Sequence, residues 1–397
     1  MRALAHGFTE LRAHPWRALL SGISLCIGVL AVVAIFTISA VTAEVFIAVA
    51  EQRQGRAVTA VGDLTVAQVT PERVRSALAA AAPLTDAGGA AAIVGNPTQR
   101  TGVAHWDGLD PGEPLALQPV TLVAGDLDDV RRLPILSGRW LNTHAEFPVE
   151  LVVNQAGAQR WGGPGTTLAV LATVDQPAVR ATIVGVVADG EGESTIFASL
   201  PALLHLRPTI LTGTTSRILL HHSGGDMAFL NAVGERMVRA AGGDPQALGL
   251  HRGDQVEHLL QQLASQRFAF LTVALIALLV SALGILNIGL ASVHERTREL
   301  VIRRAVGATR GALVGQVLTA AVLVGLLAAV VAVLTAWLGV EWWVPRRIDA
   351  ATAIETPTLP WNAVLWGITA AAATSVVGSL IPALVAARLD VATALRD

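Results

Sequence analysis

The sequence predicts a membrane protein in which four transmembrane α-helices carry an α+β extracytoplasmic domain, inserted between the first and second spans. Four long segments contain no charged residue at all. The first two of them are separated by residues 44–267, which show the turn, strand and helix patterns of a folded domain. Hydrophobic residues make up 53% of the chain and charged residues only 15%, outside the range of ordinary soluble proteins.

The uncharged segments are residues 18–43, 268–293, 311–340 and 356–387. Each has 26 residues or more, whereas a helix needs about 20 to cross a bilayer. The last span is expected to begin near Trp361, because Pro357 and Pro360 disfavour a helix before it. We therefore predict spans at 16–43, 268–293, 311–340 and 361–387.

The first segment has an alternative interpretation as a cleaved signal peptide. Small residues at Val41-Thr42-Ala43 resemble a cleavage site. The apolar stretch is longer than the 7–15 residues typical of a signal peptide, which favours a membrane anchor.

Arginine distribution predicts the orientation. Three arginines and a single acid precede the first uncharged segment, and residues 294–310 carry five arginines. The tail at 388–397 carries two more. The positive-inside rule therefore places both termini and residues 294–310 in the cytoplasm. Residues 341–360, with two arginines, are a mild exception on the outer side.

The remaining segments complete the predicted organisation. They are an interfacial amphipathic helix at 1–15, the extracytoplasmic domain at 44–267, a cytoplasmic helix at 294–310, a short extracytoplasmic loop at 341–360 and a cytoplasmic tail at 388–397. Apolar periodicity continues beyond the first span and precedes the second, so the domain is expected to have two flanking stalk helices. A frayed tail at 1–15 and two unrelated surface helices are the alternatives.

Within the extracytoplasmic domain, β-type runs and capped helical runs alternate. Apolar, β-branched runs bounded by Gly, Pro or Asp predict strands at 150–154, 167–173, 181–187 and 217–220. Cap residues and apolar periodicity predict helices at 70–82 and 226–241. Glycine- and proline-rich composition predicts loops at 107–119 and 162–165.

The absence of lysine excludes several functions. A P-loop requires a lysine next to the phosphates, and Schiff-base chemistry requires one as nucleophile, yet all 28 basic residues are arginine. ATP hydrolysis must therefore come from another polypeptide. A net charge of −2 argues against nucleic-acid binding. The one cysteine, Cys26, lies in the first predicted span, so no disulfide framework is expected.

No catalytic, cofactor or metal site is expected in the extracytoplasmic domain. The histidines at 221, 222, 251 and 258 do not have the spacing of a metal site. The aspartates at 126, 128 and 129 lack the glycine and distal glutamate of a calcium loop.

The most informative segment is residues 294–308, a dense charged stretch between two apolar spans. Ile302 and Val306 are four residues apart, and Gly307 provides a stop signal, so a short amphipathic helix is predicted there. A helix in that position can receive a push from a cytoplasmic partner.

Residues 283–308 resemble the second-span and coupling-helix motif of MacB/FtsX-type ABC transporter permeases. Residues 382–396 are similar to the C-terminal motif of that family, and 137–141, 153–154 and 184–187 resemble its periplasmic core domain. The family usually has glycine where Val301 stands and a basic pair where Leu384 and Val385 stand. Val391 and Thr393 replace its usual proline and glutamate.

This resemblance implies the permease subunit of an ABC transporter in a bacterial plasma membrane. It implies a dimer, of identical or related permeases, with two copies of a separate ATPase that binds ATP and Mg²⁺, and it leaves room for an extracytoplasmic partner protein. ATP hydrolysis would move the extracytoplasmic domains to export or extract a substrate. The alternatives are a membrane protein that senses an extracellular ligand for signalling or one that activates a cell-wall hydrolase.

The resemblance also assigns residues. Those that would couple to the ATPase are Glu295, Arg296, Arg298, Glu299, Arg303 and Arg304. Asn287, a polar residue within a span, is expected to hydrogen-bond to another helix. Gly311 and Gly315 are expected to permit close helix packing.

Overall fold

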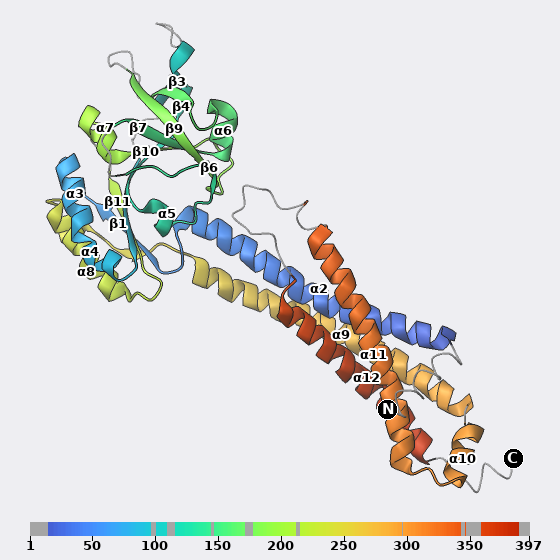
Figure 1. Cartoon of the computed structure of the whole chain (residues 1–397). Helices are drawn as coiled ribbons and strands as arrows, with labels where there is room; N and C mark the ends of the chain where they lie inside the picture. Colours follow the sequence, from blue (N-terminus) through green and yellow to red (C-terminus); the bar gives the residue numbers. More distant parts are fainter. Residues whose placement is uncertain are drawn as a thin grey trace. The chain divides into compact units, whose positions relative to one another are not determined.

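The computed structural model describes residues 15–96, 101–108, 116–143, 147–170, 178–211, 215–295, 297–342, 346 and 359–388. It divides into a helical unit and an α+β unit, the latter comprising Glu44–Leu260 (Figure 1). Residues 1–14 of the helix predicted at 1–15, Arg296, most of the loop at 341–360 and the tail beyond Arg388 lie outside the described residues, and Pro15 is the first residue of α2.

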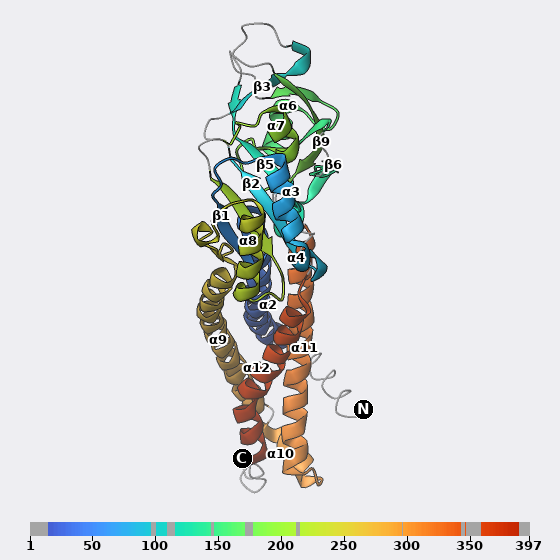
Figure 2. The same cartoon turned by 90° about the vertical axis from the view of Figure 1, so that its left-hand side faces the viewer.

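The described strands of the α+β unit form one mixed sheet (Figure 2). Their order is β12 (His251–Arg252), β1 (Thr59–Leu64), β11 (Ser216–His221), β2 (Ala90–Gly95), β5 (Val120–Gly125), β10 (Ile196–Ser199), β7 (Val149–Asn154), β9 (Val179–Val187), β8 (Thr167–Val170), β3 (Thr101–His105) and β4 (Ala116–Gln118), with β6 (Ile135–Gly138) beside β9. The pairs β5–β10 and β7–β9 are parallel, whereas β1–β11 and β11–β2 are antiparallel.

Both faces of the central strands are buried. In β2, Ala91 and Ile93 belong to one hydrophobic cluster, while Ala92 and Val94 belong to another. Successive side chains of a strand point to opposite faces, so the two clusters are the cores on the two sides of the sheet. Helices α3 (Pro71–Ala80), α7 (Leu200–Leu206) and α8 (Met227–Ala240) contribute to the first core, and α5 (Leu127–Val130) contributes to the second.

The structure confirms the helices predicted in this domain. Thr70 accepts a hydrogen bond from the Arg73 amide at the start of α3, and Pro71 occupies the first helical position. Asp226 caps α8 through the Ala228 amide. The two caps satisfy amides that have no partner within the helix, which is why these sequences begin helices where they do.

The predicted strands are also found, as β7, β8, β9 and β11, while residues 171–173 of the strand predicted at 167–173 lie outside the described residues. Sequence reasoning missed other strands, including β2, whose Ala-Ala-Ala-Ile-Val-Gly sequence has weak β propensity. The loop predicted at 107–119 was partly wrong, because residues 116–118 form the short strand β4 against β3. Pairing with a neighbouring strand overrides local composition in both cases.

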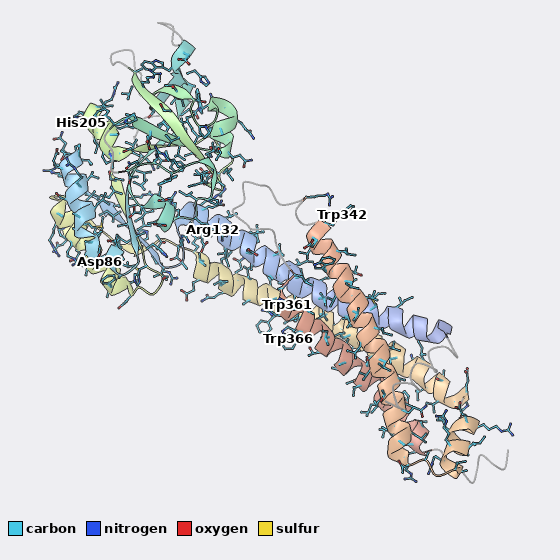
Figure 3. The ribbon with its side chains drawn as sticks, viewed as in Figure 1. Asp86, Arg132, His205, Trp342, Trp361 and Trp366 are labelled. Atoms are coloured by element: carbon cyan, nitrogen blue, oxygen red, sulfur yellow. The ribbon has the colours of Figure 1, made fainter. Side chains whose placement is uncertain are left out.

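Four of the described helices are long and apolar enough to cross a membrane. They are α2 (Pro15–Gln54), α9 (Val256–Glu295), α11 (Arg310–Trp342) and α12 (Trp361–Arg388). The fold class predicted from the sequence, four spans with an α+β domain between the first two, is therefore confirmed. Trp342 at the end of α11 and Trp361 at the start of α12 are both exposed, as expected of aromatic residues at a membrane interface (Figure 3).

Small residues let the helices approach one another. A Cβ on Gly325 of α11 would lie 3.2 Å from the Ala371 carbonyl of α12 and would clash with the Ser375 side chain. Similarly, a Cβ on Gly378 of α12 would lie 2.9 Å from the Ala282 carbonyl of α9. Close backbone approach is the usual basis of helix association in lipid, where no hydrophobic effect favours it.

Candidate functional site

Helix α10 (Thr297–Ala305) links α9 to α11 within the helical unit (Figure 1). The Thr297 hydroxyl bonds to the His294 carbonyl at 2.8 Å, at the turn between α9 and α10. At the other end, the Gly307 amide donates to the Arg304 carbonyl and the Ala308 amide donates to the Arg303 carbonyl. This pair of bonds around a glycine with φ of 104° is a Schellman cap, so Gly307 ends the helix as the sequence indicates.

One face of α10 packs against the spans. Leu300 belongs to a buried cluster with Val293 of α9, Leu313 of α11 and Ala386 of α12. Val301 is buried as well, with 2% of its surface exposed. Three of the described membrane helices therefore contribute a side chain to the surface against which α10 packs.

Arg303 joins α10 to α11. Its guanidinium donates to Gln316 Oε1 at 3.0 Å and forms an ion pair with Glu299 at 2.7 Å. These bonds hold the short helix in a defined position relative to a span. Arg303 is thus a positioning residue, a role that the sequence did not reveal because Gln316 is thirteen positions away.

The opposite face of α10 is exposed and mixes apolar with charged side chains. Ile302 is 54% exposed and Val306 84% exposed, and Arg298 is exposed one turn before Ile302. We call Arg298, Ile302 and Val306 the outer face of α10. The exposure of Ile302 and Val306 was not predicted from the sequence, although their spacing of four residues was the available signal.

The other predicted coupling residues lie around the same helix. Glu295 is exposed at the end of α9, Arg304 is half-buried in α10, and Arg296 lies outside the described residues. A cavity of about 490 Å³ opens beside them, with His294, Glu295 and Val385 in its lining. Val385 of α12 belongs to this lining, so α12 contributes an apolar wall to the cavity.

The predicted packing residues face outward in the single chain. Asn287 is exposed on α9. A Cβ on Gly311 or Gly315 would meet no atom within 4 Å among the described residues. Packing at these three positions stays a prediction that requires a second protein chain.

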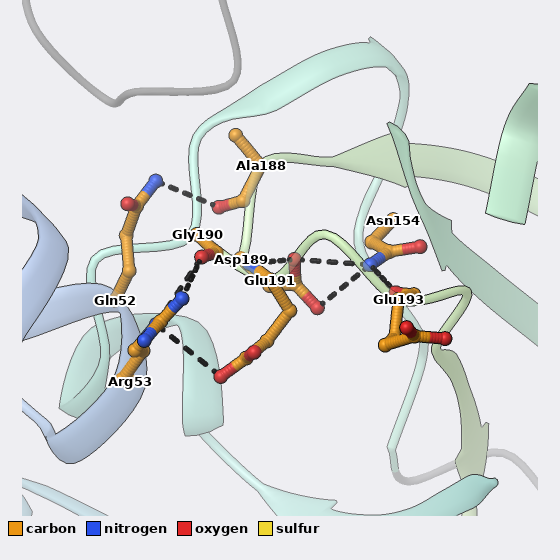
Figure 4. Close-up of polar contacts among 8 residues, drawn as sticks. All are labelled: Gln52, Arg53, Asn154, Ala188, Asp189, Gly190, Glu191 and Glu193. Atoms are coloured by element: carbon orange, nitrogen blue, oxygen red, sulfur yellow. Dashed lines mark hydrogen bonds and ion pairs between the residues drawn. The ribbon is translucent and has the colours of Figure 1, made fainter. Parts of the chain in front are cut away.

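In the α+β unit, the end of α2 is attached to the loop between β9 and β10 (Figure 4). Gln52 Nε2 donates to the Ala188 carbonyl at 3.1 Å, and the Arg53 guanidinium donates to the Gly190 carbonyl at 2.6 Å. Arg53 also forms an ion pair with Glu191 at 3.3 Å. Gly190 has φ of 72°, a conformation that favours glycine.

A buried amide fixes that loop to the sheet. Asn154, at the end of β7, donates to both carboxylate oxygens of Asp189 at 3.1 Å and to the Glu193 carbonyl at 2.7 Å. Its Oδ1 accepts from the amides of Gly157 and Thr195. Burial raises the pKa of Asp189, although hydrogen bonds from the Glu191 amide and Asn154 oppose the shift.

The start of α9 meets the same unit through Thr59 of β1. The Thr59 amide donates to the buried Asp254 carboxylate at 3.2 Å, and the Thr59 hydroxyl donates to the Arg56 carbonyl just after α2. Arg252 pairs with Asp254 at 2.9 Å. Within the α+β unit, the segments that lead out of α2 and into α9 are thus bonded to one strand residue. We call Gln52, Arg53, Thr59, Asn154, Asp189 and Asp254 the helix joint.

Two protein-family models match the chain. The MacB-like periplasmic core domain matches residues 18–244, and the FtsX-like permease C-terminal domain matches residues 271–391. The first match includes most of α2 and of the α+β unit, and the second includes most of α9 and all of α10, α11 and α12.

Individual relatives agree with the family models. An uncharacterized ABC transporter permease, YknZ of Bacillus subtilis, is 35% identical over 32% of this chain and 30% of its own length. The macrolide export ATP-binding/permease protein MacB of Sodalis glossinidius is 40% identical over 31% of this chain and 18% of its own length. The chain thus spans less than a third of the length of these curated relatives.

Solved structures give a looser likeness. The periplasmic region of MacB from Actinobacillus actinomycetemcomitans has a TM-score of 0.35 and 12% identity, covering 51% of this chain and 92% of that one. The extracellular domain of YknZ has a TM-score of 0.30 and 14% identity, covering 48% and 99%.

The family model for the periplasmic core alone spans more than half of the chain, and the permease model covers most of the remainder. The chain belongs to the MacB/FtsX-type family of ABC transporter permeases.

Proposed function

We propose that this permease couples ATP hydrolysis by a separate ATPase subunit to movement of its extracytoplasmic domain, and that this movement drives export or extraction of a substrate. The observation that carries the proposal is α10, a short capped helix seated on the spans with an exposed apolar and charged outer face. An apolar anchor surrounded by charge is the composition of a protein contact surface.

The helix joint, at the extracytoplasmic ends of α2 and α9, supports the same proposed mechanism. A displacement of α2 or α9 would reach the sheet through the short connections at 55–58 and 253–255 and through hydrogen bonds of the buried Asn154 and Asp254, which are costly to break. Secondary elements that are held rigidly at their ends transmit displacement better than flexible linkers.

The proposed assembly is a homodimer, or a heterodimer with a related permease, bound to two ATPase subunits that hold ATP and Mg²⁺. Both termini and α10 would lie on the cytoplasmic side of a bacterial plasma membrane. An extracytoplasmic partner protein would take up the movement of the domain where one exists. The permease itself would bind no cofactor.

The experiment is a reconstituted ATPase assay with the chain in lipid nanodiscs and its cognate ATPase. The wild-type chain is expected to show no hydrolysis alone and to stimulate the ATPase on mixing. Reversing Arg303 and Arg304 to Glu is expected to abolish stimulation, because it breaks the Gln316 and Glu299 contacts of α10. Ile302→Asp with Val306→Asp is expected to do the same while leaving those contacts intact.

Asn287→Leu is the matched comparison within the membrane. Interhelical hydrogen bonds in membranes average only about 0.6 kcal/mol, so this variant should retain most stimulation. If Asn287→Leu abolishes function and the α10 variants leave it near normal, the transmission mechanism is wrong and an intramembrane transport path must be sought.

The second candidate is a signalling permease, or one that activates an extracellular hydrolase. The same conformational coupling would serve it, so the ATPase assay does not separate the two. Transport of a labelled substrate into or out of proteoliposomes separates them, since only the transporter moves material in proportion to ATP hydrolysed.

A further inference from the structure

Within the helical unit, helix α9 has one face that packs inside the chain and one that is exposed (Figure 1). On the packed face, the Ser281 hydroxyl donates to the Ser24 carbonyl of α2 at 2.9 Å, and the Ala282 carbonyl lies close to Gly378 of α12. On the other face, six large apolar side chains are more than half exposed: Val273, Leu275, Ile276, Leu279, Val280 and Leu283. In a bilayer such a face is covered either by lipid or by another helix.

The exposed face of α9 contains a heptad pattern. One set of residues, spaced by seven, consists of Val273, Val280 and Asn287. A second set follows the first by three residues and consists of Ile276, Leu283 and Leu290. In a coiled coil these two sets occupy the a and d positions, which face the partner helix. The first five of these residues along the chain are exposed and the last is half-buried. We call the six residues the α9 seam.

Asn287 is the polar member of the α9 seam. It is exposed and precedes the end of α9 at Glu295 by eight residues, which is about 12 Å of helix. An amide exposed at this depth faces hydrocarbon unless another helix covers it, and placing an amide in hydrocarbon without a hydrogen bond is costly. Thr272 is also exposed on α9, but its hydroxyl donates to the Phe268 carbonyl at 3.0 Å within the same helix. A second helix would therefore benefit Asn287 more than Thr272.

The residue types of the α9 seam favour two parallel helices. Valine at a positions with leucine at d positions is typical of two-stranded parallel coiled coils, and a single asparagine at an a position sets their register and number of strands. Two copies of this chain in one membrane have the same orientation, so their α9 helices run parallel and their Asn287 side chains lie at the same depth. Because an amide group contains both donors and an acceptor, two asparagine side chains can hydrogen-bond to each other.

We propose that two copies of the chain associate through the α9 seam as a parallel two-stranded coiled coil, with their Asn287 amides hydrogen-bonded to each other. From Val273 to Leu290 the seam is about 26 Å long, which approaches the hydrocarbon thickness of roughly 30 Å. The same surface is used by both copies, so the contact closes at a dimer. This inference rests on the homodimer of the proposed function and identifies the surface that forms it.

Disulfide cross-linking tests the α9 seam in membranes that contain the full chain without an ATPase. Ile276→Cys and Val280→Cys are made separately in the Cys26→Ala background, and the thiols are oxidised with copper phenanthroline. Both variants are expected to form a covalent dimer, because a and d side chains of the two helices face each other. Both positions are exposed in the single chain, so neither substitution opens a cavity in its fold.

Leu275→Cys is the matched control for Ile276→Cys. The two side chains are 58% and 56% exposed, and they are neighbours at nearly the same depth in the membrane. They point in directions about 100° apart around the helix, so Leu275 lies off the seam. A disulfide requires Cα atoms within about 7 Å of each other, and Leu275→Cys is therefore expected to give only the small amount of dimer that forms by random collision.

Asn287→Val measures the contribution of the amide pair, since valine is the residue at the other a positions of the seam. Energy transfer between labelled chains, followed as the protein-to-lipid ratio falls, gives the dissociation constant of the dimer. The variant is expected to raise this constant about threefold, as the loss of one interhelical hydrogen bond in a membrane implies. Thr272→Val is the control and should change it less than about twofold, because its hydroxyl is bonded within α9.

Equal cross-linking of Leu275→Cys and Ile276→Cys would overturn the inference, because it would mean that lipid covers this face and that copies meet only by collision. Failure of both seam variants to cross-link would also overturn it, as would a dissociation constant that Asn287→Val leaves unchanged. The test is separate from the proposed coupling to an ATPase. If the α10 variants failed to affect ATPase stimulation, the coupling proposal would fall while cross-linking at the seam persisted.

Discussion

At the scale of single residues, the Asn154 side chain makes more hydrogen bonds than any other described side chain of the helix joint. One buried amide group caps α6 (Gln155–Trp161) through Gly157, holds the Thr195 amide and binds the Asp189 carboxylate. Removing such a group leaves the Gly157 and Thr195 amides without their acceptor and leaves Asp189 with the Glu191 amide as its donor, and each buried unsatisfied group costs about 1–3 kcal/mol.

Asn154→Ala is therefore expected to destabilise the α+β unit by about 2–4 kcal/mol, the sum of a lost cap and orphaned donors. Thermal unfolding of the chain in nanodiscs measures the loss as a lower apparent Tm. Asn231→Ala is the control, since Asn231 is exposed on α8 and donates a surface hydrogen bond to Glu235. Equal Tm values for the two variants would contradict the role given to Asn154.

A second residue-scale prediction concerns pH. The hydrogen bonds from Arg139 lower the pKa of Glu150, and the Asn142 amide acts in the same direction, although burial opposes them. A lowered folded-state pKa contributes stability that is present above the unfolded value of about 4.3 and is lost as the pH falls through the folded value.

Glu150→Gln is accordingly expected to lower the apparent Tm at pH 7 and to have a much smaller effect near pH 3. Glu235→Gln, which removes a surface pair with Arg239, should change the Tm little at either pH. A pH-independent loss in Glu150→Gln would show that the carboxylate charge is not what stabilises this contact.

At the scale of elements, sequence predicts those that have a local signal and fails for those fixed by distant partners. Thr70-Pro71 and Gly307 begin and end helices where the sequence indicates, because caps are local chemistry. The alanine-rich β2 has no such signal and is a strand because β11 and β5 flank it. The Arg303–Gln316 bond and the exposure of Ile302 likewise depend on how α10 lies on α11.

Helix packing supplies an element-scale prediction with an internal control. Gly325→Leu is expected to disrupt the contact of α11 with α12, because the first added carbon already meets Ser375. Gly311→Leu in the same helix adds the same side chain into open space within the chain. The first variant should lower the apparent Tm in nanodiscs strongly and the second slightly; the reverse order would show that the described contact is not the native one.

At the scale of the whole molecule, the arginine bias predicts which side of the membrane each segment occupies. In a Cys26→Ala background, Gly192→Cys should react with an impermeant thiol reagent in intact cells, because a Cβ there meets nothing within 4 Å. Ala305→Cys, exposed on α10, should react only after the cells are opened. The opposite pattern would overturn both the orientation and the assignment of α10 to an ATPase.

The central claim is that ATP bound by a partner moves the extracytoplasmic domain through α10, and one distance measurement tests it most directly. A spin label at Gly192→Cys on each copy of the Cys26→Ala chain, in nanodiscs with the cognate ATPase, reports the separation of the two domains by pulsed electron paramagnetic resonance. We expect a distance distribution that shifts when ATP is trapped and stays at the nucleotide-free position in the Ile302→Asp, Val306→Asp variant. An unchanged distribution in a complex that hydrolyses ATP, or the same shift in that variant, would contradict it.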